Sequence, residues 1–183
     1  MVYVYLATGF EEIEALTCID ILRRGDVDAK GVSITGDYCV KGAHGIPVIA
    51  DLLFEEADKD ACDMIVLPGG LPGAQYLQDH EGLAEIIKEF AATGKWVCAI
   101  CAAPMALGHH GVLEEKKATI YPGMEDRLTG AEPVSELAVR DGNIITGMAP
   151  GAAMEFALTL LEALKGKDVA DEVREGACPW LSA

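Results

Sequence analysis

Hydrophobic and polar residues follow one another along this chain in blocks that predict strands and helices in alternation. Short apolar runs rich in β-branched residues predict buried strands at residues 2–7, 29–35, 64–67, 95–100 and 117–121. Helical spacing, acidic starts and glycine or basic ends predict helices at residues 11–24, 81–93, 102–109, 151–165 and 168–175. Extended, hairpin-like segments are expected at residues 37–50 and, around the Asp141-Gly142 turn, at residues 134–147. The alternation predicts an α/β fold whose mostly parallel sheet is covered by helices on both faces, with one antiparallel element.

Length and composition place the chain among globular domains. Its 183 residues predict a single domain spanning residues 1–183, and a hydrophobic share of 51% is ample for a core, which excludes intrinsic disorder. With 14 lysines and arginines against 30 aspartates and glutamates, the net charge is −16. No basic stripe is present for phosphate contacts, so we expect no nucleic-acid partner. No apolar run reaches the roughly 20 residues of a membrane span, so we expect no membrane partner.

The beginning of the chain and its cysteines indicate a reducing compartment. Met1 leads directly into the first predicted strand, without a basic leader or a cleavage site, which predicts a cytoplasmic protein. The six cysteines are then expected to be thiols rather than a disulfide framework. The role of those thiols becomes the main question about the function of the chain.

Cys101 occupies the junction between the predicted strand at residues 95–100 and the predicted helix at residues 102–109. Ligands of parallel sheets bind beyond the carboxyl ends of the strands, and nucleophile elbows use this kind of strand-to-helix turn. Unpaired N–H groups at a helix start lower the pKa of a thiol, so the position suits a reactive thiolate. A buried cysteine acting as a small hydrophobe is the alternative interpretation. The other five cysteines are expected to be structural: Cys18, Cys39, Cys62, Cys98 and Cys178.

Cys98 and Cys101 form a C-x-x-C pattern, which elsewhere marks redox pairs and metal sites. Because Cys98 lies in the middle of the predicted strand, the two Cα atoms should be roughly 10 Å apart, beyond the ~7 Å that a disulfide permits. No histidine pattern supplies the two further ligands that a metal ion would need. We therefore expect neither a disulfide nor a metal ion at this pair.

Glu14 is out of place on its helix. On a helical wheel it shares one face with three apolar residues, Cys18, Ile21 and Leu22. A carboxyl group on that face costs free energy unless it is paired or protonated, which makes Glu14 a candidate functional acid. The alternative is a rim residue or an acid that stabilises the helix dipole, a role that suits Glu11 and Glu12.

Ile13 lies on the opposite face of the same helix, which is otherwise polar. Thr17 and Asp20 share that face with it. An apolar side chain in this position indicates a contact between subunits, although single exposed isoleucines are also ordinary.

Two further features limit the chemistry. The Pro68-Gly69-Gly70 turn after the third predicted strand leaves bare N–H groups that could bind a carbonyl oxygen or an oxyanion, although the same residues also form plain turns. His109 and His110 end the helix that follows Cys101, roughly 12–13 Å along its axis, so they cannot reach the thiol. No histidine follows them, so a hydrolase whose cysteine pairs with a later histidine is excluded. Any histidine base would have to be His44 or His80.

Four segments, taken in order, resemble one protein family. They are Gly9-Phe10-Glu11-Glu12-Ile13-Glu14, Val66-Leu67-Pro68-Gly69-Gly70, Ala99-Ile100-Cys101-Ala102-Ala103-Pro104 and the stretch from Pro150-Gly151 to Leu158. Together they resemble the ThiJ/PfpI superfamily, in its parkinsonism-associated, deglycase-like branch. The resemblance implies a flavodoxin-like three-layer α/β sandwich with a mostly parallel central sheet. It also implies a homodimer formed through the first helix, which fits the positions of Ile13, Thr17 and Asp20.

The resemblance also assigns roles to residues. It implies that Cys101 is the reactive cysteine and that Glu14 is an acid, held protonated, that hydrogen-bonds its thiol. The backbone N–H groups of Gly70 and Ala102 would face the substrate oxygen. Tyr121 stands where some relatives carry a histidine, and with a pKa of about 10 a tyrosine is a poor base at neutral pH.

The same resemblance implies an enzyme that uses no cofactor and acts on reactive carbonyls such as methylglyoxal, as a glyoxalase or as a deglycase of small molecules or glycated proteins. Two other functions stay open. The thiol could oxidise stepwise as a redox sensor or a chaperone of the oxidative-stress response, which needs no general base. It could also hydrate or hydrolyse another small electrophile.

Overall fold

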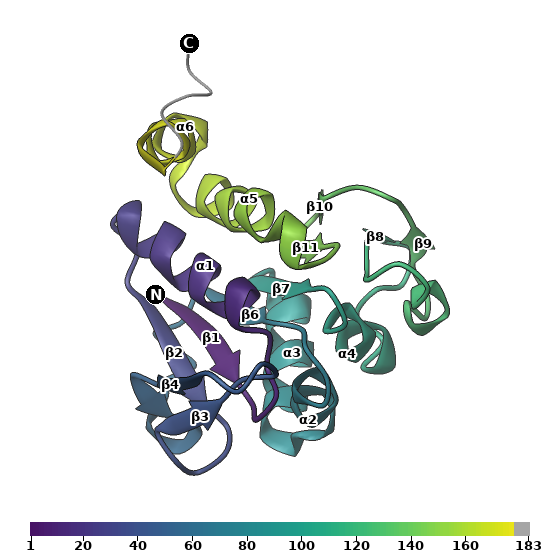
Figure 1. Ribbon diagram of the computed structural model, residues 1–183. Helices are drawn as coiled ribbons and strands as arrows, with labels where there is room; N and C mark the ends of the chain where they lie inside the picture. The colour runs from purple at the N-terminus through teal and green to yellow at the C-terminus, as the bar shows by residue number, and fades with distance from the viewer. Residues whose placement is uncertain (178–183) are drawn as a thin grey trace.

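The computed structural model describes residues 1–177, whose arrangement is shown in Figure 1. Seven strands form a central sheet in the order β10-β11-β7-β6-β1-β2-β5. Neighbouring strands are parallel, except that β10 and β11 run antiparallel around the expected Asp141-Gly142 turn. In sheet order, the strands span Ala138–Asp141, Ile144–Gly147, Trp96–Ile100, Met64–Leu67, Val2–Leu6, Ala29–Ser33 and Leu52–Leu53. The mostly parallel sheet that the sequence predicts is confirmed.

Helices cover both faces of this sheet (Figure 1). One face carries α1 (Glu12–Arg24), α5 (Ala153–Lys165) and α6 (Lys167–Ala177), and the other carries α2 (Gly73–Asp79), α3 (Glu81–Thr93) and α4 (Pro104–His109). Successive residues of β1 point to opposite faces, so Val4 packs with the first group of helices and Tyr5 with the second. The three-layer sandwich is thereby confirmed. No described helix combines the length and the apolar composition that a bilayer crossing requires.

Smaller elements extend from the sheet. β3 (Cys39–Lys41) and β4 (Pro47–Ile49) form the expected antiparallel hairpin. β8 (Lys117–Ala118) is shorter than the strand predicted at residues 117–121, and it pairs with β9 (Glu132–Pro133) rather than with the central sheet. Three short 3-10 helices complete the described elements: η1 (Phe54–Glu56), η2 (Glu125–Arg127) and η3 (Pro150–Ala152).

The sequence patterns miss several short elements, among them α2 and β5, and α4 and α5 each begin two residues later than predicted. The helix α2 is only seven residues long and starts at a glycine after Pro72, so it shows no helical period. The two-residue β5 is also too short for a pattern. α4 begins at Pro104 rather than at residue 102, because residues 101–103 form the turn out of β7. α5 begins at Ala153 because η3 precedes it.

The strand order places three chain segments at one edge of the sheet. The chain leaves β1 toward β2, and it sets β6 and β7 on the other side of β1, so the strand order reverses between β1 and β6. In doubly wound sheets, ligands bind at such a reversal, beyond the carboxyl ends of the strands. Glu14, Gly69 and Cys101 follow the ends of β1, β6 and β7, and they therefore meet at this edge.

Candidate active site

Cys101 lies in a strained turn between β7 and α4. Its φ is +63°, in the left-handed region that residues other than glycine rarely adopt. Two backbone hydrogen bonds hold this conformation: the Cys101 N–H donates to the Gly147 carbonyl at 2.9 Å, and the Tyr121 N–H donates to the Cys101 carbonyl at 2.9 Å. The side chain is 7% exposed. The neighbouring segments thus fix the backbone of the candidate nucleophile at the sheet edge.

Glu14 lies in the first turn of α1, on the face that packs against the sheet, as its helical spacing predicts. Its side chain is fully buried. Glu14 Oε2 accepts the Gly69 N–H at 2.7 Å, and the Glu14 N–H donates to Glu11 Oε2 at 2.8 Å. Glu14 Oε1 is buried and has no hydrogen-bond partner of good geometry among the described residues. A buried carboxyl group with one free oxygen is well placed to hold a proton.

Gly69 is the residue that lets Glu14 and Cys101 approach each other. A Cβ at residue 69 would lie 2.7 Å from the Cys101 Cβ and 2.8 Å from Glu14 Oε2, so a side chain there would displace both. Gly70 has a φ of +81°, and a Cβ there would lie 2.5 Å from the Glu11 nitrogen. Glycine at both positions therefore brings backbone N–H groups close to the carboxyl and the thiol.

The carboxyl and the thiol change each other's ionisation. Burial raises the pKa of Glu14 to about 7, while the hydrogen bonds made by its carboxyl group oppose that shift. Burial, followed by the charge and the hydrogen bonding of Glu14, raises the pKa of Cys101 to about 12, against the effect of the Ala102 and Gly70 N–H groups. The lowering of the thiol pKa expected at a helix start is opposed here, because α4 begins only at Pro104 and burial beside a carboxyl group raises that pKa. The carboxyl group ionises before the thiol.

Comparisons with known proteins fit this arrangement. The sequence profile of the DJ-1/PfpI family matches residues 1–163. The chain belongs to the DJ-1/PfpI family. The structure of oxidized Toxoplasma gondii DJ-1 superimposes with a TM-score of 0.92 at 34% identity, over 96% of each chain. The flavodoxin-like fold implied by the four sequence segments is thereby confirmed.

Curated DJ-1 relatives differ in how much of their length this chain covers. Protein DJ-1 homolog A of Arabidopsis thaliana is 42% identical over 175 residues, which are 94% of this chain and 45% of the relative. Homolog B of the same plant is covered over 40% of its length, so the chain spans less than half of both plant proteins. A Caenorhabditis elegans relative, named glutathione-independent glyoxalase DJR-1.2, is 31% identical over 172 residues, which are 92% of this chain and 90% of that protein.

Neither candidate histidine base bonds to Cys101 among the described residues of this DJ-1/PfpI chain. The His44 N–H donates to Glu12 Oε1 at 2.8 Å, and His44 Nδ1 lies 2.8 Å from Glu12 Oε2. His80 Nδ1 accepts the Leu83 N–H at 3.1 Å and so caps α3. Glu12 lies in the first turn of α1, as expected of an acid that stabilises the helix dipole, but it is not a rim residue, because its side chain is buried and anchors the loop of the β3–β4 hairpin.

Tyr121 contributes its backbone to the turn at Cys101. Its side chain is 47% exposed. Within residues 1–177, the Tyr121 hydroxyl makes no hydrogen bond to the Cys101 thiol. A role for this phenol in the site of the DJ-1/PfpI chain stays a prediction.

The remaining cysteines of this DJ-1/PfpI member differ in their surroundings. Cys18, Cys62 and Cys98 are buried free thiols, as structural cysteines should be. Burial raises the pKa of the Cys98 thiol well above its usual range. Cys39 is an exposed free thiol in β3, at the periphery of the fold and outside the core. Cys178 lies outside the described residues.

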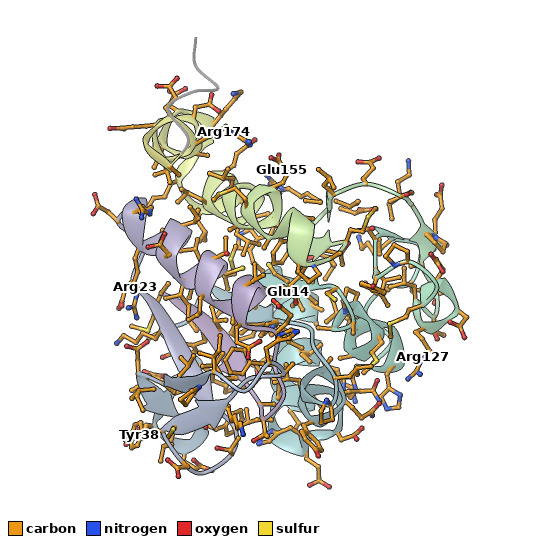
Figure 2. All side chains as sticks on the ribbon, viewed as in Figure 1. Glu14, Arg23, Tyr38, Arg127, Glu155 and Arg174 are labelled. Atoms are coloured by element: carbon orange, nitrogen blue, oxygen red, sulfur yellow. The ribbon has the colours of Figure 1, made fainter. Side chains whose placement is uncertain are left out.

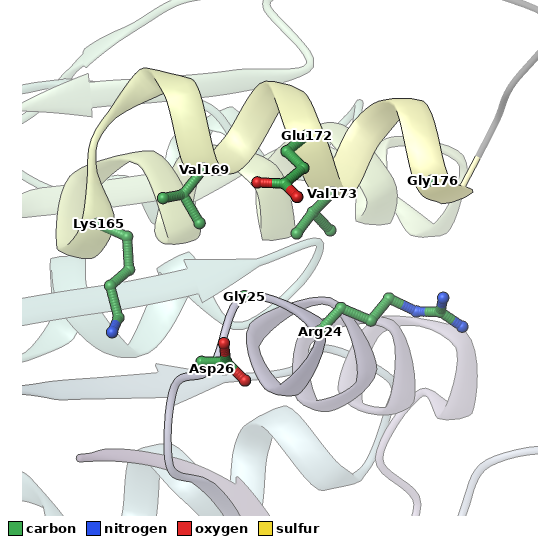
Figure 3. A pocket seen from close by; sticks show the side chains of 8 residues that line it. All are labelled: Arg24, Gly25, Asp26, Lys165, Val169, Glu172, Val173 and Gly176. Carbon is green, nitrogen blue, oxygen red and sulfur yellow. The ribbon is translucent and has the colours of Figure 1, made fainter.

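A cavity of about 470 Å³ lies at the far end of α1, against α6 (Figure 3). Its walls carry the apolar side chains of Val169 and Val173 together with charges of both signs, among them Arg24 and Glu172. Because Glu14 lies in the first turn of α1 and Arg24 ends that helix, this cavity is separate from the candidate active site.

Proposed function

We propose that this chain is a cofactor-independent, thiol-dependent enzyme that acts on reactive carbonyls of the methylglyoxal type, as a glyoxalase or a deglycase. The observation that carries the proposal is the contact of a buried carboxyl group with a buried thiol across Gly69, at the carboxyl edge of a parallel sheet. The name of the Caenorhabditis elegans relative supports the same reaction class. The carbonyl group would be attacked by the Cys101 sulfur, with Glu14 as the acid–base group.

The first step is addition of the thiol to the aldehyde. With a pKa of about 7, Glu14 is ionised in a large part of the molecules at neutral pH and can take the Cys101 proton as the C–S bond forms. The carbonyl π electrons move to oxygen and give an alkoxide. The N–H groups of Gly70 and Ala102, which favour a negative charge at Cys101, are suited to stabilise this oxygen. The proton on Glu14 then neutralises the alkoxide and yields a hemithioacetal.

The second step moves a proton between two carbons. Glu14 takes the proton from the carbon that bears sulfur, and the electron pair moves toward the neighbouring carbonyl, whose oxygen takes the negative charge of an enediolate. Return of the proton from Glu14 to the second carbon, together with transfer of the hydroxyl proton from the first oxygen to the second, gives a lactoyl thioester. Water then cleaves the thioester, releases lactate and restores the Cys101 thiol. Atoms and electrons balance without an external oxidant or reductant, so this sequence requires no cofactor.

The pH dependence of turnover follows from the ionisation of Glu14. Because the base form is needed to accept the thiol proton, kcat/KM for methylglyoxal should rise as pH passes through about 7 and then level off. Methylglyoxal consumption and lactate formation by purified protein, measured from about pH 5 to about pH 9, test this. The proposal fails if lactate does not form, or if kcat/KM falls over the interval in which Glu14 ionises.

We further propose a homodimer that forms through the exposed face of α1. Ile13 and Leu16 on this helix, and Ile46 and Ile49 in the β3–β4 hairpin, are between 40% and 71% exposed. The hairpin lies against the start of α1, because Glu12 Oε1 also accepts the Ile46 N–H at 3.4 Å. Four large apolar side chains on adjoining elements form a surface that association would remove from water.

Replacing Ile13 with aspartate should separate the proposed dimer. The substitution places a carboxylate in an apolar contact of a chain that already carries a net charge of −16. We expect the dimer dissociation constant to rise by roughly 100-fold, as measured by sedimentation equilibrium. Leu137→Asp changes an exposed residue outside both elements and should leave the dimer intact. An equal effect of the two variants would contradict the α1 interface.

A further inference from the structure

Three potential ligand groups converge where α1 begins, beside the β3–β4 hairpin. Glu11, Glu12 and His44 each present one atom, and these atoms all lie within 4.8 Å of one another. His44 Nδ1 is 2.8 Å from Glu12 Oε2 and 3.8 Å from Glu11 Oε1. Neither the thiol of Cys101 nor the carboxyl group of Glu14 belongs to this set.

Backbone N–H groups hold both carboxylates in place through one oxygen each. Glu11 Oε2 accepts the Glu14 N–H, and Glu12 Oε1 accepts the N–H groups of His44 and Ile46. The second oxygen of each carboxylate, Glu11 Oε1 and Glu12 Oε2, is the one that faces His44. Outer hydrogen bonds that orient the ligands in this way are typical of metal sites in proteins.

One oxygen in this cluster of ligand groups, Glu11 Oε1, has no hydrogen-bond partner among the described residues. The Glu11 side chain is 7% exposed, and among the described residues no hydrogen bond to its Oε1 is present. Its contact with His44 Nδ1, at 3.8 Å, is too long for a hydrogen bond. A carboxylate oxygen that lacks a protein donor and faces an imidazole nitrogen is suited to receive a cation.

The local charge balance also favours a cation. Two neighbouring carboxylates are more than nine-tenths buried, and within residues 1–177 the group that makes an ion pair with either of them is His44. In the single chain that side chain is 69% exposed, so it leaves a path from solvent to the two carboxylates.

We propose that Glu11, Glu12 and His44 bind a divalent transition-metal ion of the zinc class. Two carboxylate oxygens and one imidazole nitrogen are a donor set that zinc accepts, with water completing the coordination. The ion would replace the proton between His44 Nδ1 and Glu12 Oε2, and that proton would pass to solvent. Binding would cross-link the hairpin loop to the first turn of α1.

Calorimetric titration of the chelator-treated chain with zinc chloride tests this site. We expect one zinc ion per chain, binding that weakens as pH falls, and an affinity at least about 100-fold lower in His44→Ala. Glu11→Gln keeps an oxygen for the Glu14 N–H while it removes the charge, and it should also weaken binding. His109→Ala, in an exposed position at the end of α4, is the matched control and should bind as wild type.

A second variant separates this site from binding by the thiol. Cys101→Ser should retain the zinc ion, and the ¹⁵N resonance of His44 Nδ1 should move on zinc addition. The proposal is overturned if wild type binds no zinc, if His44→Ala and Glu11→Gln bind as wild type, or if Cys101→Ser abolishes binding. Because the readouts are affinity and a nitrogen resonance, these outcomes do not depend on whether the chain consumes methylglyoxal.

Discussion

Replacing Cys101 with serine is expected to abolish the consumption of methylglyoxal, with kcat/KM falling by at least about 1,000-fold. The hydroxyl group is a far weaker nucleophile than the thiol at the same position, and it would meet the same buried surroundings. The fold should survive, because serine is close to cysteine in size and the turn is held by its backbone hydrogen bonds to Gly147 and Tyr121. Initial rates of methylglyoxal loss and circular dichroism spectra provide the measurement.

Cys39→Ser is the matched control for this variant. Cys39 is an exposed free thiol in β3, so a direct reaction of methylglyoxal with accessible thiols would slow in Cys39→Ser. Enzymatic turnover at Cys101 would continue in that variant. Equal rates in wild type and Cys101→Ser would contradict the enzyme proposal. If wild type itself has no turnover, peroxide treatment followed by intact mass measurement tests the sensor alternative, which requires a gain of about 32 Da at Cys101.

Glu14→Gln should separate turnover from thiol ionisation. Glutamine can still accept the Gly69 N–H, but it cannot take a proton, so kcat should fall by about 100-fold to 10,000-fold. The charge of Glu14 and its hydrogen bond both raise the pKa of Cys101, so the same variant should lower that pKa. The alkylation rate of Cys101 by iodoacetamide at about pH 9 should therefore increase while methylglyoxal turnover is lost.

Glu155→Gln controls for the loss of a carboxylate elsewhere. Glu155 pairs with Arg174 between α5 and α6, away from Glu14 at the start of α1 (Figure 2). Its removal should change neither turnover nor alkylation. A Glu14→Gln variant that keeps wild-type turnover would rule out the proposed proton transfer. If alkylation of Cys101 slows together with turnover in Glu14→Gln, then Glu14 promotes the thiolate form of Cys101 instead of suppressing it.

Local spacing is sufficient to single out the two main residues of the candidate site. Glu14 repeats with Cys18, Ile21 and Leu22 at helical intervals, so its burial follows from the sequence alone, and Cys101 stands at a visible change from strand to helix. Local spacing does not predict how Glu14 and Cys101 change each other's pKa. The pKa of Cys101 depends on a carboxyl group 87 positions earlier in the chain (101 − 14), and only the order of β1, β6 and β7 brings the two together.

Glu12 shows the same limit more clearly. In sequence it is an ordinary acid at a helix start, no different from Glu11. Its burial is decided by the β3–β4 hairpin, which places the His44 and Ile46 N–H groups over it. A helical wheel describes contacts with the sheet, but not contacts with a loop that returns to the helix end. The short α2 and β5 escape prediction for another reason, since neither repeats its period often enough to show a pattern.

The first turn of α1 joins events that would otherwise be independent. Glu14 faces the thiol, the adjacent Ile13 faces the proposed partner subunit, and the preceding Glu11 holds the helix start through the Glu14 N–H. Because these residues share a single helical turn, a displacement of that turn at one contact also changes the geometry of the other two. By thermodynamic linkage, a ligand that binds Cys101 more tightly in the dimer must strengthen the dimer by the same factor. The dimer dissociation constant and the affinity of Cys101 for its ligand would then depend on each other.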